Sequence, residues 1–202
     1  MADIEEDFLS RNQKLKAAFK APPFIPRRVL KDLGTENIMG DRYFSYEFMQ
    51  QEWEKVWKKT WHFVMKASEL DQPGAFYTHE LGKESFLFVR GSDDQIRGFY
   101  NVCRHRGNRL CQVEEGVVNA FTCPYHGWKW NDDGSLKQVA DPQFFRQFDE
   151  GIPEDELGLV SVKIDVWEGW LWFNMDSDAC SLRDYLGPIG EHLETYHFED
   201  CT

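Results

Sequence analysis

The sequence predicts a mainly β protein, an antiparallel β-sandwich with an N-terminal helical arm and a short helical C-terminal segment. From Trp61 onward, apolar side chains recur at every second position in short runs, and clusters of Gly, Pro, Asn and Asp separate these runs. Such alternation is typical of half-buried strands joined as hairpins. The 202 residues are enough for one domain and part of a second.

Residues 1–44 are expected to form the arm. Residues 3–20 could form a helix. Residues 21–26 contain three prolines and must be extended, because proline disfavours helix both at its own position and at the preceding one.

A helix is expected from Ser45 to Thr60, with Ser45 as its N-cap. Apolar side chains follow at helical spacing, and we expect this stripe to pack on a sheet. The stripe consists of Tyr46, Met49, Trp53 and Val56, and it ends at Thr60.

Short strands are expected to follow, and the pair Glu168-Gly169 to join the last two as a tight hairpin. Residues 181–198 are expected to be partly helical. The expected strands cover residues 61–64, 75–80, 85–89, 96–102, 117–123, 128–130, 136–139, 160–167 and 170–174.

The charge and the cysteines narrow the function. A formal net charge of -12 disfavours nucleic acid and anionic membranes as partners. No apolar run is long enough to span a bilayer, and the acidic N-terminus lacks the features of a secretory signal, so a cytoplasmic location is expected. The 5 cysteines form an odd, irregularly spaced set, which favours metal binding over a disulfide framework.

Two motifs indicate the chemistry: Cys103-x-His105 and, after 17 intervening residues, Cys123-x-x-His126. Two thiolates and two neutral imidazoles balance the +2 charge of an oxidised [2Fe–2S] core, so the site accepts an electron more easily than an all-cysteine site does. A structural zinc site uses the same ligand types, but zinc sites usually show paired-cysteine knuckles, which this sequence lacks. Coincidence is the other alternative, and Gly107 and Gly127 argue against it because they suit loops that wrap closely around a cluster.

At these residues the chain resembles the N-terminal, Rieske-domain part of the large (α) subunit of Rieske non-haem iron oxygenases, which hydroxylate aromatic rings and other substrates. The resemblance implies a Rieske-type β-sandwich in which Cys103 and Cys123 hold one iron and His105 and His126 hold the other. It covers nearly the whole chain and includes Thr60-Trp61-His62, Pro73-Gly74, residues 101–107 and 123–128, Gly158-Leu159, and the Trp-x-Gly-Trp-x-Trp-x-Asn run that ends at Asn174.

The resemblance also implies a function. Electrons from NAD(P)H would arrive through a reductase or ferredoxin and pass to a mononuclear Fe(II), which supports O₂-dependent hydroxylation as a mono- or dioxygenase. In the family this iron lies in a C-terminal domain of a neighbouring subunit, within a ring-shaped homo-oligomer, with a trimer as one option. The alternative is a free-standing Rieske ferredoxin, a pure electron carrier.

The second iron site is expected to be missing from this chain. His192 and His197 match the spacing of a His-x₄-His motif, but position 189 is Ile where the family has Asp. We therefore expect these histidines to lie on the surface, and His62 and His79 to be packing or surface residues. The expected domains are the arm (1–44), a Rieske domain with its leading helix (45–175), and the start of a truncated catalytic domain (176–202).

Two differences from respiratory Rieske proteins concern the cluster's surroundings. Tyr125 stands where those proteins have an extra cysteine, and Trp128 replaces a serine that donates to a cluster sulfur; Cys111 has no evident partner. Fewer donors stabilise the reduced cluster less, so a potential toward the low end of the Rieske range of about -150 to +300 mV is expected.

The motifs also carry a basic cluster, which consists of Arg104, Arg106 and Arg109. It could pair with nearby carboxylates, or it could form a docking surface for an acidic ferredoxin or reductase, and the sequence leaves both interpretations open.

Overall fold

The computed structural model describes residues 34–37, 39–146 and 152–200. The expected arm helix over residues 3–20 and the extended stretch 21–26 lie outside the described residues. The chain divides into two units, with the boundary between Met39 and Gly40. All that follows concerns the second unit.

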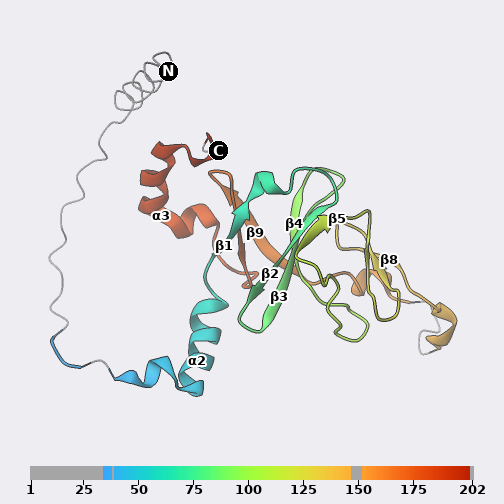
Figure 1. Ribbon diagram of the computed structural model, residues 1–202, viewed down its shortest axis with the longest axis horizontal. Coiled ribbons are helices and arrows are strands. Elements are labelled where there is room, and N and C mark those ends of the chain that lie inside the picture. Colours follow the sequence, from blue (N-terminus) through green and yellow to red (C-terminus); the bar gives the residue numbers. More distant parts are fainter. Residues whose placement is uncertain (1–33, 38, 147–151, 201–202) are drawn as a thin grey trace, which may run out of the picture. The chain divides into compact units, whose positions relative to one another are not determined.

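A seven-stranded antiparallel sheet forms the larger part of this unit (Figure 1). The two hairpins at its centre, β2–β3 and β9–β10, have continuous antiparallel registers. In spatial order the strands are β1 (His62–Lys66), β10 (Trp170–Asn174), β9 (Ser161–Trp167), β4 (Ile96–Tyr100), β3 (Glu84–Arg90), β2 (Ala75–Leu81) and β5 (Glu115–Val117).

A second, three-stranded sheet consists of β6 (Phe121–Thr122), β7 (Lys129–Trp130) and β8 (Leu136–Gln138). The single strand expected over residues 117–123 is therefore wrong, because its two ends belong to different sheets. The Val118 N–H still donates to the Gly74 carbonyl at 3.0 Å. The chain then bends at residues 119–120 and enters the smaller sheet.

The mainly β prediction is confirmed, and strand β3, in the interior of the sheet, lies between two hydrophobic cores. Phe86 and Phe88 pack in one core with Phe173, whereas Leu87 and Val89 pack in the other. Successive side chains of a strand point to opposite faces. The second core also contains Cys103, Cys123 and Trp128 and therefore joins the large sheet to the cysteine motifs.

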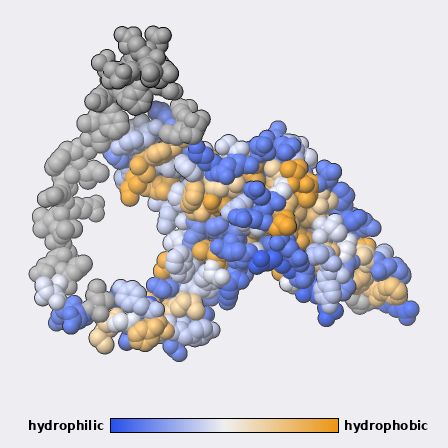
Figure 2. All heavy atoms as spheres, in the orientation of Figure 1, coloured by the Kyte–Doolittle hydropathy of each residue, from blue (hydrophilic) through white to orange (hydrophobic). Residues whose placement is uncertain are grey.

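The leading helix begins where expected but packs differently. Ser45 Oγ accepts from the Phe48 N–H at 3.2 Å and caps α2 (Tyr46–Glu52), which continues into a π-helical turn, Trp53–Trp57. The prediction that the whole stripe packs on a sheet is wrong, because Trp53 alone among its apolar residues is buried. Figure 2 shows apolar residues at the surface of this segment. Tyr46 and Met49 are exposed although both lie in the regular helix α2, so the helical spacing is kept but no surface covers this part of the stripe.

The C-terminal segment is partly helical, as expected. Ser181 caps α3 (Leu182–Leu193), and the helix is interrupted at Gly187, directly before Pro188. Proline disfavours helical geometry in the residue before it. None of the helices in the described part of the chain combines the length and hydropathy that a bilayer span requires. Single 3₁₀ turns occur at Gly40–Tyr43, Ala67–Glu69, Pro142–Phe144, Glu154–Glu156, Glu194–Tyr196 and Phe198–Asp200.

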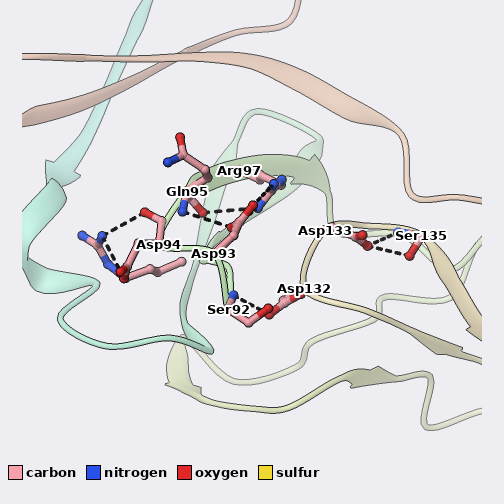
Figure 3. A network of polar contacts seen from close by, with 9 residues as sticks. Ser92, Asp93, Asp94, Gln95, Arg97, Asp132, Asp133 and Ser135 are labelled. Carbon is pink, nitrogen blue, oxygen red and sulfur yellow. Dashed lines mark hydrogen bonds and ion pairs between the residues drawn. The ribbon is translucent and has the colours of Figure 1, made fainter.

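A polar network links the two sheets through their turns (Figure 3). The Ser92 N–H, in the β3–β4 turn, donates to Asp132 Oδ2 of the β7–β8 turn at 2.7 Å. Arg97 binds both carboxylate oxygens of Asp93, at 2.8 and 2.6 Å. This bidentate pair holds the pKa of the Asp93 carboxyl well below its usual range. The network therefore helps to position the smaller sheet.

Candidate metal centre

Two loops with the same backbone frame carry the four predicted ligands; we call residues 103–108 the first loop and residues 123–128 the second loop. In each loop the cysteine N–H donates to the carbonyl five residues later, at 2.8 Å. In each, the glycine N–H donates back to the cysteine carbonyl at 3.0 Å. The glycines, Gly107 and Gly127, have φ of 70° and 73°, a region that favours glycine.

Paired backbone segments fix the ends of both loops. Val102 and Arg109 form an antiparallel bridge around the first loop. The second loop joins β6 to β7, where Thr122 pairs with Lys129. Both ligand sets are therefore positioned by backbone pairing rather than by flexible ends.

The structure brings all four predicted residues together at the facing loops. Cys103 and Cys123 are 3% and 1% exposed and belong to the same hydrophobic core. The rings of His105 and His126 lie 4.7 Å apart, centroid to centroid. The Nδ1 atom of His105 is buried and has no hydrogen-bond partner. A buried nitrogen without a partner is costly unless a ligand satisfies it.

Aromatic side chains hold the two imidazoles. The His105 ring stacks on Trp128 at 4.7 Å and 6° and meets Phe145 edge-on at 5.7 Å. His126 instead lies against Tyr125, with centroids 3.8 Å apart. Trp128 is buried whereas Tyr125 is exposed. One imidazole thus faces a packed interior and the other a side chain at the surface.

The titration of these groups suits metal ligation. Burial lowers the pKa of His105, and the neighbouring His126 and Arg106 lower it further, which favours the neutral imidazole that binds metals. Burial also raises the pKa of the Cys103 thiol, and its hydrogen bond with Cys123 adds to this effect. A bound metal cation reverses that preference, because it binds the thiolate.

A single metal ion would need its donor atoms close together. Four donors on one zinc ion, at roughly 2.0–2.3 Å each, would lie within about 4.6 Å of one another. Among the described residues, the only group of three or more metal-binding side chains with donor atoms all within 4.8 Å is Glu168, His197 and Glu199. The four predicted ligands do not belong to that group.

Asn108 is a polar neighbour of the centre that the sequence analysis did not single out. Its side-chain Nδ2 lies 3.9 Å from Cys123 Sγ. The sequence could have pointed to Asn108 by its position, because it follows Cys103 by five residues, as Trp128 follows Cys123. Phe145 was also missed, since it comes from the segment after β8 and no motif marks it.

In the basic cluster, one arginine pairs with a carboxylate, whereas the other two stay available for docking. Arg109 pairs with Glu80 of β2 at 3.0 Å, as the structural interpretation expects. Arg104 donates to the carbonyl of Glu156 at 3.4 Å, and Arg106 lies over the Tyr125 ring at 6.0 Å. Within the described residues, no carboxylate pairs with Arg104 or Arg106, so both guanidinium charges stay available at the surface.

The remaining histidines lie in packing or surface positions. His62 stacks on Trp57 at 5.9 Å, and His79 meets Phe173 edge-on at the same distance. His192 contacts Tyr196, and His197 is exposed. The four cysteines in the described residues, 103, 111, 123 and 180, are free thiols, and burial raises the pKa of Cys111 to about 12.

Comparison with known proteins identifies the domain. The family model of the Rieske [2Fe-2S] domain matches residues 60–149, which include both loops. The match confirms that a Rieske [2Fe–2S] cluster is the cofactor of this domain.

The curated relatives are oxygenase subunits. The carnitine monooxygenase oxygenase subunit of Acinetobacter baumannii is 34% identical over 151 residues, which cover 75% of this chain and 40% of the relative. The large oxygenase component of the naphthalene 1,2-dioxygenase system of Pseudomonas aeruginosa is 34% identical over 168 residues, 81% of this chain and 37% of the relative. The chain thus spans about 40% of the length of the curated relatives it matches.

A solved structure agrees with these relatives. A quaternary ammonium Rieske monooxygenase, described for carnitine oxidation and inter-subunit electron transfer, superimposes with a TM-score of 0.69 at 33% identity. The match covers 76% of this chain and 41% of that one. The Rieske-type fold predicted from the sequence is confirmed.

Proposed function

We propose that this chain, which carries the Rieske [2Fe–2S] domain of Rieske oxygenase large subunits, passes single electrons through a cluster held by Cys103, His105, Cys123 and His126. The observation that carries the assignment is the meeting of two buried thiols and two imidazoles on matching loops, with the buried His105 Nδ1 left without a partner.

Each part of the site has a distinct task. By analogy with the family, Cys103 and Cys123 would hold one iron, and His105 and His126 the other. The bound cluster would supply a one-electron acceptor and donor. Trp128 and Phe145 pack against the His105 ring. His126 lies beside the exposed Tyr125 and marks the side from which a partner could exchange electrons.

In the parent protein, this domain would be the entry point for electrons. A reductase or ferredoxin would deliver electrons from NAD(P)H, and they would pass to a mononuclear Fe(II) in the remaining part of such a large subunit for O₂-dependent hydroxylation. Inter-subunit electron transfer is described for the solved quaternary ammonium relative, which supports transfer within a homo-oligomer here too. Domain boundaries at 44 and 175 and a cytoplasmic location stay predictions.

A free-standing Rieske ferredoxin is the less favoured alternative. The similarity to oxygenase subunits covers 75–81% of the chain, whereas the Rieske domain itself matches only residues 60–149. The similarity to oxygenase subunits therefore extends beyond the Rieske domain, which a free-standing ferredoxin would not require. Carnitine and naphthalene oxygenases match equally, at 34% identity, and their common feature is the electron-transfer step.

The exposed cations of the first loop suit an acidic electron donor. Arg104 and Arg106 lie directly beside His105 and are free of carboxylate partners within the described residues. Charge complementarity raises the rate of encounter between redox partners, whose interfaces are small.

Absorption and EPR spectra of the anaerobically purified chain, before and after dithionite, test the cluster. We expect a red-brown oxidised form, equal amounts of iron and acid-labile sulfide, and a reduced signal that averages near g ~1.9, as mixed Cys/His ligation predicts. A colourless protein with stoichiometric zinc would overturn the proposal.

A pair of cysteine variants assigns the ligands. Cys123→Ser should lose the iron and the EPR signal, because a thiolate ligand is removed. Cys111→Ser is the matched control, since Cys111 is a partly buried free thiol of the same core outside both loops. Equal cluster content in the two variants would contradict the ligand set.

A further inference from the structure

Given the ligand set proposed above, we infer that Asn108 is a positioning residue that raises the reduction potential of the cluster. Its side-chain amide would do so by donating a hydrogen bond to Sγ of Cys123, a ligand on the opposite loop. No motif predicted this role.

The orientation of the amide follows from its second partner. Asn108 Nδ2 lies 2.7 Å from the carbonyl oxygen of Arg109 and 3.9 Å from Cys123 Sγ. A backbone carbonyl only accepts hydrogen bonds, so the NH₂ group, rather than the amide oxygen, must face this side. One amide hydrogen therefore binds the carbonyl, and the other is available to the sulfur.

The donor and the acceptor are both held by backbone contacts. The Asn108 carbonyl accepts from the Cys103 N–H at 2.8 Å, and the Val102–Arg109 bridge closes the loop around it. Across the site, the Cys123 N–H is bound to the Trp128 carbonyl at 2.8 Å. Such preorganisation lets the amide respond to the charge on the sulfur without a change in loop structure.

Cys123 Sγ has a hydrogen-bond donor from outside its own loop. Among the described residues, Asn108 is the one side-chain amide that donates to this sulfur. The corresponding residue of the second loop, Trp128, stacks on His105 instead. The side-chain amide at Cys123 Sγ therefore comes from the first loop.

The sign of the effect follows from charge. Reduction adds one negative charge to the cluster, and part of it resides on the ligand sulfurs. A hydrogen-bond donor stabilises the more negative state more strongly, so it raises the potential. Asn108 therefore supplies a donor that the expectation of a potential near the low end of the Rieske range did not include.

Redox titration of the cluster-loaded full chain, monitored by EPR, tests this role. Asn108→Leu keeps the approximate side-chain shape and removes the donor. We expect the equilibrium constant for reduction to fall about tenfold, which for a one-electron couple corresponds to about 59 mV. Asn108→Asp also removes the donor and adds a negative charge, so its potential should fall at least as far.

Asn131→Leu is the matched control. Asn131 also uses its side-chain amide in a turn, where it donates to Ser135 Oγ at 2.9 Å, and its potential should equal that of the unchanged protein. A merely structural role for Asn108 would lower stability or cluster content and leave the potential unchanged.

The outcomes separate this inference from the proposed function. An unchanged chain without a Rieske EPR signal would overturn the function itself. A normal signal in the unchanged chain, with an unshifted potential in the Asn108→Leu or the Asn108→Asp protein, would overturn the role of Asn108 alone. If the leucine variant fails to retain its cluster, the isosteric aspartate variant decides between the two outcomes.

Discussion

The first and second loops share one backbone frame but differ in nearly every side chain around it. Both have the same two hydrogen bonds and a glycine at positive φ. The first loop carries two exposed arginines, whereas the second carries Pro124 and an exposed tyrosine. The comparison shows that the frame places the ligands, while the other side chains set their surroundings.

The side chains of each loop contact the ligands of the other loop. Trp128 of the second loop stacks on His105 of the first, and Asn108 of the first reaches Cys123 of the second. Arg106 likewise lies over the Tyr125 ring. Each loop is therefore completed by its partner, so a change in one loop should be detected at the ligand of the other.

The largest expected effect is on stability, and it differs between Trp128 and Asn108, the residues that directly follow Gly127 and Gly107. Trp128→Ala should cost about 3–5 kcal/mol of unfolding free energy, because it removes a buried indole from the core. Asn108→Ala should cost only about 1 kcal/mol, the usual value of one hydrogen bond. Urea denaturation of the iron-loaded proteins, followed by the absorption of the cluster, measures both.

Trp57→Ala provides the control for the tryptophan change. The Trp57 side chain is 42% exposed, so its removal should cost clearly less than that of Trp128. Equal losses of unfolding free energy at Trp57 and Trp128 would contradict a stabilising role for the packing of Trp128 on His105.

A smaller effect should be the same in both loops. Gly107→Ala and Gly127→Ala each place a Cβ at positive φ, which costs about 1–2 kcal/mol. Space is not the limit, since an added Cβ at Gly107 meets nothing within 4 Å and one at Gly127 meets only Ala140 Cβ at 3.7 Å. Thermal unfolding should show matching losses. A loss in one loop alone would contradict the shared frame.

The smallest effect concerns the charge that only the first loop carries. Arg106→Gln should slow reduction by an acidic [2Fe–2S] ferredoxin about threefold at low ionic strength, with a smaller difference in high salt. Arg109→Gln is the matched control, because Glu80 already pairs with that arginine. Stopped-flow absorption gives both rates. An equal decrease in the two variants would remove the distinction between the arginines.

Much of the fold was predictable from local pattern. Alternating apolar residues and turn signals located the hairpins, and the Glu168-Gly169 turn joins β9 to β10 as expected. The division of residues 117–123 between two sheets was not predictable, because an apolar run does not specify the strand with which it pairs. The exposure of the Tyr46–Val56 stripe was missed for a similar reason, since spacing shows periodicity but not the presence of a covering surface.

For the centre itself, the sequence determined the types of ligand and their order, because Cys-x-His and Cys-x-x-His limit the chemistry to a few metal sites. The tertiary structure alone decided the contacts around those ligands. Trp128 meets His105, and Asn108 meets Cys123, across loops separated by β5 and β6 in different sheets. The physical reason is that hydrogen bonding and stacking depend on a few ångströms of position, which long-range packing sets and residue spacing does not.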